Sequence, residues 1–368
     1  MRVALVIYGS LDTISGGFLY DQKLVEYLQD QSDQVEIISL PWRSYPRLLL
    51  DNLSLALYRR LVSLNVDVLI QDELCHPSLF WINRRLKKRV RYPIVSIVHH
   101  LRSSEAHPAG VMGLYRLVER EYLRTNDGFV YNSRTTRQAV EALSSSRLSG
   151  VVAFPSGQFR PEIDATEIIV RAHQPGPLKL LFIGNLIPRK GLHTLLDALE
   201  SMPPGIAELT VVGGYLSDSH YAREMLTRMR TRMRDSKQPG CIKFLGALSR
   251  EELAGVVRTH HLIAVPSSYE GYGIVYLEGM GYGLPAIATT RGAAGEIITD
   301  GQDGYLVPPE DPAALAAVFS SLAVNRDRLA ALSLAARRCY LDHPTWEQTG
   351  VSIRRFIYDL AFGRINDV

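Results

Sequence analysis

Two glutamates, Glu270 and Glu278, are the residues of this sequence best suited to binding a small polar molecule. An apolar run at 262–265 precedes them and stops at a Pro-Ser turn. Such a run, apolar without alternation, predicts a parallel strand that is buried on both faces. Glu270 is therefore expected at the carboxyl edge of a sheet, where ligands bind in open α/β proteins. A carboxylate can accept two hydrogen bonds from neighbouring hydroxyls, so the pair suits a sugar or a ribose.

Glycines separate this predicted strand from the helix that carries Glu278. Gly271 and Gly273 leave the backbone without side-chain bulk, so a ligand can approach the first helical turn. The N–H groups there have no partner within the helix, and the helix dipole favours negative charge beside them. Further ligand contacts are expected from the amides of Tyr272, Gly273 and Ile274. The alternative is that Glu270 only caps the helix and Glu278 lies on a solvated face.

Two other predicted strands lead to residues that could bind an anion. One ends shortly before Lys190, whose ammonium group at a helix start can neutralise a diphosphate. Another, at 3–8, leads to Gly16 and Gly17, and bare amides at a helix start can also hold an anion. The alternative for the glycine pair is a plain turn between strand and helix.

A histidine, His99, follows a further buried strand at 94–98. A histidine in this position can donate a hydrogen bond to a sugar hydroxyl or a phosphate, and it titrates near neutral pH. A single histidine is more often structural, but this one is expected at the same sheet edge as Gly16. We therefore include it among the site residues.

Three further motifs follow the glutamate pair before residue 308. They are Gly283-Leu284-Pro285, Glu296-Ile297-Ile298, and Asp300-Gly301 with Gly304-Tyr305-Leu306-Val307. Together with the glutamates they resemble the retaining, GT-B-fold, nucleotide-sugar glycosyltransferases of family 4, also called glycosyl transferases group 1. The resemblance is specific over these motifs and continues more weakly over nearly the whole chain.

The resemblance implies an α/β protein of GT-B fold, with two Rossmann-like domains that face each other across a cleft. It assigns Glu278 to the ribose hydroxyls, and both Glu270 and His99 to the donor sugar. The glycine pair at 16–17 is expected beside the donor diphosphate or the acceptor. The anomeric configuration is then retained, and the usual proposal is a front-face route in which the leaving phosphate takes the acceptor proton. The expected catalytic residues are Glu270, His99 and Lys190.

One position departs from the family pattern. The family binds the diphosphate through an arginine and a lysine, but Asn185 stands where the arginine is expected. Either Arg189 takes over, or Lys190 and an amide hold the anion. The departure also supports an alternative function, a catalytically silent scaffold that binds nucleotide. Two further alternatives are a sugar-nucleotide epimerase, which needs no acceptor, and a hydrolase in which Glu270 attacks the sugar.

The length of 368 residues predicts two domains, because single hydrophobic cores stop growing below that size. We expect an acceptor domain at 1–160, a linker rich in Pro and Gly at 161–177 and a nucleotide-sugar domain at 178–346. A last helix, at 347–368, is expected to cross back onto the first domain, as in the family.

The composition narrows the choice of partners. A net charge of +3 gives no argument for nucleic acid. The sequence has no Asp-x-Asp pair to hold a metal ion and no GxGxxG motif to bind NAD, so neither a metal nor a cofactor is expected beside the nucleotide-sugar donor. No side-chain pattern distinguishes a UDP, GDP or ADP donor, or a glycan from a lipid-linked acceptor.

The sequence predicts a cytoplasmic protein. No apolar window approaches the roughly 20 residues of a membrane span, and the first residues are typical of a strand, not of a signal peptide. The leucine-rich segment 45–61 is expected to form an amphipathic helix that faces the core. An exposed version, like the basic run at 84–91, would suit peripheral contact with the inner face of a membrane.

Overall fold

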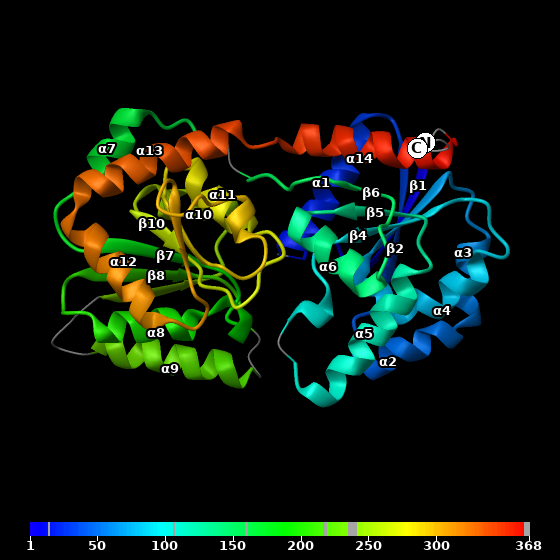
Figure 1. Ribbon diagram of the computed structural model, residues 1–368, viewed down its shortest axis with the longest axis horizontal. Coiled ribbons are helices and arrows are strands. Elements are labelled where there is room, and N and C mark those ends of the chain that lie inside the picture. The colour runs from blue at the N-terminus through cyan, green and yellow to red at the C-terminus, as the bar shows by residue number, and fades with distance from the viewer. Residues whose placement is uncertain (14, 106, 159–160, 216–218, 235–240, 364–368) are drawn as a thin grey trace. The chain divides into compact units, whose positions relative to one another are not determined.

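The computed structural model describes residues 1–368 except 14, 106, 159–160, 216–218, 235–240 and 364–368. The described residues form two compact units, each a parallel sheet with helices on its faces (Figure 1). Unit 1 comprises Met1–Ser156 and Pro344–Val368, and unit 2 comprises Gly157–His343. Within the described ranges, no helix is both long enough and apolar enough to cross a membrane.

The sheet of unit 1 has six parallel strands in the order β2-β1-β3-β4-β5-β6. They are β1 (Arg2–Tyr8), β2 (Gln34–Leu40), β3 (Val68–Asp72), β4 (Ile94–Val98), β5 (Gly128–Tyr131) and β6 (Gly150–Val152). Along β1, odd-numbered residues 3–7 join one hydrophobic cluster and even-numbered residues 4–8 join another. Successive side chains point to opposite faces, so both faces of the sheet are buried.

Helices cover both faces of this sheet. α1 (Gly16–Asp30) and α14 (Trp346–Ala361) share one hydrophobic cluster with the sheet. α4 (His76–Leu86), α5 (Ala109–Leu123) and α6 (Arg134–Ser144) share the other. The last helix therefore packs within unit 1, as the sequence predicts, although it ends at Ala361 and residues 364–368 of its predicted span lie outside the described ones.

The predicted single helix over 45–61 is wrong. The segment forms three short helices, α2 (Tyr45–Leu50), the 3-10 turn η1 (Asp51–Leu53) and α3 (Leu55–Val62). The break has a tertiary cause, because the buried side chain of Asn52 donates to the carbonyl of Pro77 (2.7 Å) and accepts from the amide of Trp81 (2.9 Å). The neighbouring residues Leu50 and Leu53 are 63% and 68% exposed, so much of this segment faces outward.

The sheet of unit 2 also has six parallel strands, in the order β12-β11-β10-β7-β8-β9. They are β7 (Leu178–Ile183), β8 (Ala207–Val212), β9 (Ile242–Gly246), β10 (Leu262–Ala264), β11 (Ala286–Thr289) and β12 (Gly304–Val307). Its helices are α7 (Ala165–Ala172), α8 (Leu192–Ser201), α9 (His220–Arg234), α10 (Arg250–Arg258), α11 (Ile274–Gly281), α12 (Pro312–Val324) and α13 (Arg326–Asp342). The chain goes from β7 to β8 and β9 on one side, and then returns to place β10 on the other side of β7.

The predicted linker at 161–177 is corrected by α7. Asp164 caps this helix by accepting from the amide of Glu167 (2.8 Å), and the helix packs against α13. The buried guanidinium of Arg171 donates to the carbonyls of Tyr282 and Gly283, at 2.7 and 2.9 Å. Most of the segment is thus an integral part of unit 2.

Candidate active site

The site lies at the carboxyl edge of the unit 2 sheet, between β7 and β10. These two strands are neighbours, but the connections from them run in opposite directions along the sheet. Such a reversal opens a crevice at the strand ends, which is where open α/β sheets bind ligands. Arg189 and Lys190 follow β7, and Glu270 follows β10. The topology therefore brings together residues that are distant in the sequence.

Glu270 is the centre of a charged cluster. Its carboxylate accepts from Lys190 Nζ at 2.8 Å and from Ser267 Oγ at 2.9 Å, and Arg189 Nη1 lies 3.4 Å away. Burial opposes its ionisation, but the charges of Lys190 and Arg189 and the hydrogen bonds from Lys190 and Ser267 prevail and lower the pKa of Glu270 to about 2. Glu270 is therefore ionised throughout the physiological range and holds two cations at the end of β7.

The loop around Glu270 is fixed by the backbone. The carbonyl of Glu270 accepts from the amide of Ala293 (2.9 Å), and Tyr276 donates its hydroxyl hydrogen to the carbonyl of Val265 (2.8 Å). Gly273, the cap of α11, has a φ of +101°, which side chains other than glycine rarely adopt. The predicted role of this glycine as a residue without side-chain bulk thus agrees with a backbone conformation that needs it.

Glu278 lies on α11 and contrasts with Glu270. Among the described residues, its partly buried carboxyl forms neither a hydrogen bond nor an ion pair. Burial raises its pKa to about 7, although the charges of Arg250 and Lys190 act in the opposite direction. A carboxyl with this environment can accept hydrogen bonds from a ligand without first breaking an internal contact.

The remaining predicted contacts of unit 2 lie at the start of α11. Gly271, Tyr272 and Gly273 are buried and Ile274 is partly buried. The hydroxyl of Tyr272 lies 3.2 Å from Nε2 of His343, the residue that follows α13. The side chain of Tyr272 is thus engaged with His343, and the predicted ligand contact concerns the backbone amide of Tyr272.

The other predicted residues, Gly16, Gly17 and His99, belong to unit 1. α1 begins at Gly16, after its cap Ser15, and His99 follows β4. A Cβ atom on Gly17 would lie 3.2 Å from the ring of His99, so the glycine allows the ring to pack against α1. The structure thus brings these three residues together at the carboxyl edge of the unit 1 sheet.

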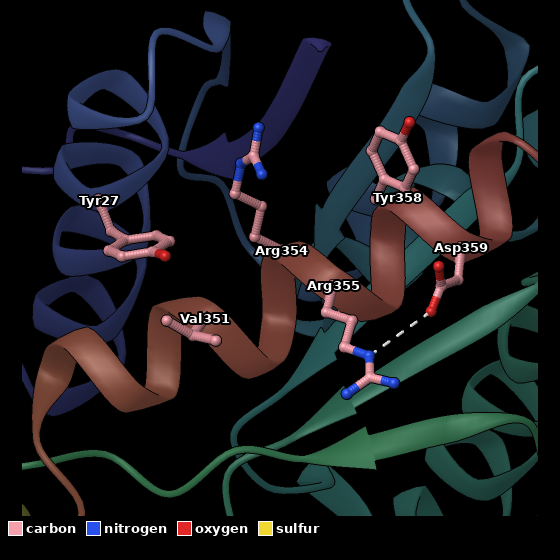
Figure 2. Close-up of a pocket in the computed structure, with 6 residues that line it drawn as sticks. All are labelled: Tyr27, Val351, Arg354, Arg355, Tyr358 and Asp359. Atoms are coloured by element: carbon pink, nitrogen blue, oxygen red, sulfur yellow. Dashed lines mark ion pairs between the residues drawn. The ribbon is translucent and has the colours of Figure 1, made fainter.

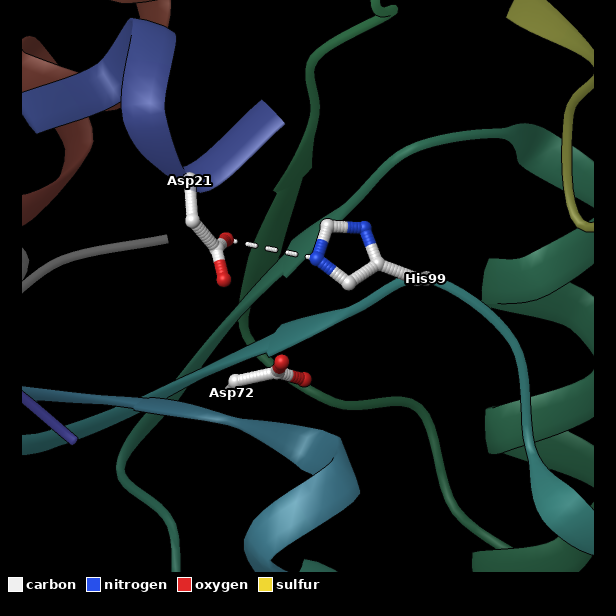
Figure 3. A group of neighbouring side chains, drawn as sticks. All are labelled: Asp21, Asp72 and His99. Atoms are coloured by element: carbon white, nitrogen blue, oxygen red, sulfur yellow. Dashed lines mark hydrogen bonds and ion pairs between the residues drawn. The ribbon is translucent and has the colours of Figure 1, made fainter. Parts of the chain in front are cut away.

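His99 has partners that the sequence analysis missed. Its Nε2 lies 3.3 Å from Asp21 Oδ1, and Asp72 lies beside them at the end of β3 (Figure 3). Burial lowers the pKa of His99, but the charges of Asp21, Asp72 and Glu73 and the hydrogen bond to Asp21 outweigh this effect and raise it to about 9. Asp21 lies inside a helix and Asp72 ends a strand, and no sequence motif links them. The signal that could have identified Asp72 is its position two residues after the apolar run 68–70, at the expected carboxyl end of a strand.

A surface hollow of unit 1 is separate from these residues. It lies between α1 and α14 (Figure 2) and is lined by Tyr27, Val351, Arg354, Arg355, Tyr358 and Asp359. Arg354 Nε lies 2.7 Å from Asp33 Oδ2, and this ion pair joins α14 to the turn between α1 and β2. No predicted site residue lines the hollow, so we assign it no role in the site.

Solved structures show which fold the two units make together. The chain matches sucrose-phosphate synthase from Thermosynechococcus elongatus with a TM-score of 0.81 at 19% identity, over 99% of each chain. It matches Anabaena Alr3699/HepE, solved in complex with UDP-glucose, with a TM-score of 0.77 at 16% identity, over 98% of this chain and 100% of that chain. At these identities the matches establish the fold, which is GT-B.

Sequence comparison finds a family match within unit 2. Residues 165–338 match the family described as glycosyl transferases group 1. The chain is 28% identical over 244 residues to a glycogen synthase of Mycobacterium tuberculosis, which is 62% of this chain and 54% of that protein. It is 30% identical over 205 residues to a D-inositol 3-phosphate glycosyltransferase of a Nocardioides species, 52% of this chain and 44% of that one. The family match lies within unit 2, and the chain spans about half the length of the curated relatives that it matches.

Proposed function

We propose that the protein is a retaining glycosyltransferase that moves a hexose-type sugar from a nucleoside-diphosphate sugar to an acceptor hydroxyl. The contrast between the two glutamates is the observation that carries this proposal. Glu270 is ionised and saturated by Lys190, Arg189 and Ser267, whereas Glu278 has no partner among the described residues. The first arrangement presents cations to a diphosphate, and the second presents a free acceptor to the ribose hydroxyls.

Lys190 and Arg189 supply the charge that the reaction needs. Negative charge develops on the departing diphosphate as the bond to the anomeric carbon breaks, and fixed cations stabilise it. Arg189 and Lys190 approach the same carboxylate. Arg189 is therefore well placed to act in place of the family arginine, whose position is occupied by Asn185 in this chain. One carboxylate beside two cations suits an anion better than a metal ion, which supports transfer without a metal at the diphosphate. Retention would follow the front-face route, in which the leaving phosphate takes the acceptor proton.

The relatives name different donors. HepE was solved with UDP-glucose, and a Mycolicibacterium smegmatis relative, 28% identical over 212 residues, is a GDP-mannose-dependent mannosyltransferase. We therefore propose a screen of UDP, GDP and ADP and their sugars by calorimetry.

Glu278→Gln should weaken binding of the preferred nucleotide by about 1 to 3 kcal/mol, because a ribose hydroxyl pair loses its charged acceptor. Glu251→Gln, at an exposed glutamate of α10, serves as the matched control.

The outcomes of the screen separate the alternatives. Absence of binding to every nucleoside diphosphate would reject the proposal and leave the hydrolase. Binding followed by turnover without an acceptor would indicate the epimerase. Binding without turnover of any nucleotide sugar, tested with glycan and lipid-linked acceptors, would indicate the silent scaffold.

A membrane-associated acceptor is the second part of the proposal. Large apolar side chains of unit 1 are exposed on and near α2, η1, α3, α4 and α5; they are Trp42, Leu50, Leu53, Leu55, Trp81, Val111, Leu114 and Leu117. Among the described elements, α4 packs against α2, η1, α3 and α5. Exposed apolar groups among arginines and lysines favour peripheral contact with anionic lipid headgroups. We propose such contact at the cytoplasmic face, with a lipid-linked sugar as acceptor.

A further inference from the structure

Asp21, Asp72 and His99 form a buried cluster at the carboxyl edge of the unit 1 sheet. In this sheet β1 lies between β2 and β3, so the connections from β1 and β3 run in opposite directions. The crevice expected at that reversal is flanked by the residues after β1 and after β3. Asp72 is the last residue of β3, and α1, which follows β1, carries Asp21. The cluster therefore stands where the fold makes a second binding position.

Both aspartates are fully buried, and in each of them one carboxylate oxygen lacks a hydrogen bond from the described residues. Their exposed fractions are 0% for Asp21 and 1% for Asp72. Asp21 Oδ1 faces His99 Nε2 at 3.3 Å and Asp72 Oδ1 accepts from the amide of Leu74 at 2.9 Å. Asp21 Oδ2 and Asp72 Oδ2 have no hydrogen-bond partner in the described part of the chain. Two buried carboxylates without a cation would be costly, and the ring of His99, which lies beside both, can supply a positive charge when it is protonated.

The other edge of the His99 ring has a different environment. Figure 3 shows Nδ1 on the side of the ring that is turned away from both aspartates. Nδ1 forms no hydrogen bond with the described residues, and the side chain of His99 keeps 11% of its surface exposed. One ring nitrogen is thus committed to Asp21, and the other is available to a ligand.

We propose that Asp21 and Asp72 hold His99 as an imidazolium, with Nε2–H donating to Asp21 and Nδ1–H offered to the sugar or the diphosphate of the donor. The proposal rests on the proposed function for the identity of the ligand. Asp21 and Asp72 are positioning residues, and His99 is the group that contacts the donor. His99 then acts as a hydrogen-bond donor and not as a general base, because a general base needs an unprotonated nitrogen at the working pH.

The titratable groups around the cluster favour the protonated form of His99. The titratable groups that face it are Asp21 from α1, Asp72 and Glu73 from the end of β3, and the thiol of Cys75. Burial and the charge of Asp21 raise the pKa of Asp72 to about 7, whereas His99 lowers it. Burial and the nearby carboxylates keep Cys75 as a neutral thiol by raising its pKa. At neutral pH, His99 is therefore the only cation among these groups.

Nuclear magnetic resonance of ring-labelled histidine tests the pairing directly. The nitrogen shifts and long-range couplings of His99, assigned with His99→Gln, should show both nitrogens protonated at neutral pH and a pKa of about 9. In Asp21→Asn the pKa should fall toward the ordinary value of histidine, and Asp21→Glu should restore part of the shift. A neutral His99 ring at pH 7 in the wild-type protein would overturn the proposal. The decisive spectrum is that of the wild-type protein, and His99→Gln serves only to assign the signals.

Enzyme kinetics test the role of the pair. The value of kcat/KM for the preferred donor should fall in wild type as the pH rises through about 9. In Asp21→Asn this fall should move to lower pH, with a rise in KM. An unchanged profile would reject the positioning role even if transferase activity persists.

If no nucleotide sugar is bound, the proposed function fails, while the histidine resonances still decide the pairing. A stoichiometric divalent cation, found by elemental analysis of the purified protein, would also overturn the proposal, because it would replace the proton.

Discussion

Glu270 and Glu278 carry the same side chain, but their pKa values are shifted in opposite directions because their neighbours differ. Two cations and a hydroxyl stabilise the ionised form of Glu270, whereas burial without a hydrogen bond disfavours the ionised form of Glu278. The first residue is therefore a fixed charge, and the second can change its protonation in the physiological range.

This difference predicts how donor binding depends on pH. Ribose hydroxyls donate to the ionised form of Glu278, whose pKa without ligand is about 7. Nucleotide affinity should therefore increase as the pH rises from 6 and level off above about pH 8. Calorimetric titrations across this range measure the effect, and Glu278→Gln should abolish the dependence. A profile that is equal in the two proteins would remove Glu278 from the nucleotide site.

Asp72→Asn should stabilise the protein at alkaline pH. The pKa of Asp72 in the folded protein is about 7, above its ordinary value, so the folded state retains a proton that the unfolded chain loses. Stability linked to this group is complete at low pH and decreases as the pH rises through about 7. The advantage of the variant, measured by thermal unfolding, should thus be larger at pH 8 than at pH 5. Asparagine caps the turn η2 (Glu73–Cys75) as well as aspartate does, so loss of the cap should not contribute to the difference in stability.

Part of the candidate site could be predicted from local sequence motifs. Glu270 and Lys190 follow apolar strands, and Glu278 is on the helix after Glu270, so strand pattern and residue spacing identified them as candidates. Asp21 and Asp72 are 51 positions apart, and only the sheet order places them together. Their partnership with His99 could not be read from either segment alone.

Among the helices, α14 illustrates how a single side chain fixes an element. Ile353 and Ile357 are fully buried in the cluster that α14 shares with α1 and the sheet, whereas Val351 is 50% exposed. Ile353→Ala should lower the free energy of unfolding by about 2 to 5 kcal/mol, since it leaves a cavity. Val351→Ala is the control and should change it by less than about 0.5 kcal/mol. Equal effects in denaturant unfolding would show that Ile353 does not anchor the helix.

Two segments show where prediction of elements from sequence stops. The strand predicted at 94–98 agrees residue for residue with β4, because an apolar run interrupted only by Ser96 determines it. The segment 45–61 has a helical pattern, yet Asn52 breaks it through bonds to residues of α4 and its start. The segment around α7 is rich in Pro and Gly at its ends, and its helix depends on packing against α13. Both errors arise from contacts that are distant in sequence.

At the scale of the whole molecule, charge is unevenly distributed. The net charge is only +3, yet segments 42–62, 76–91 and 109–124 together hold thirteen arginines and lysines against three acidic residues. These segments include α2, α3, α4 and α5, and most of the large exposed apolar side chains of unit 1 lie in the same segments. Positive charge beside apolar groups attracts anionic membranes at moderate ionic strength.

Vesicle sedimentation tests this membrane contact. The protein should bind vesicles of phosphatidylcholine with phosphatidylglycerol, bind phosphatidylcholine alone weakly, and dissociate as salt increases. Replacing exposed Leu53 and Trp81 by serine should reduce binding several-fold without loss of stability. Leu341→Ser, at a residue of α13 that is 62% exposed, is the matched control in unit 2. Binding that is insensitive to lipid charge would reject the contact.

The assignment of α14 to unit 1 has a consequence for biosynthesis. A ribosome releases the first 156 residues, then all of Gly157–His343, and only afterwards the helix whose isoleucines complete the earlier core. Unit 2 can therefore fold while the hydrophobic core of unit 1 still lacks α14. A chain truncated before Pro344 would lack Ile353 and Ile357 and would expose the apolar residues of α1 and the sheet that α14 covers.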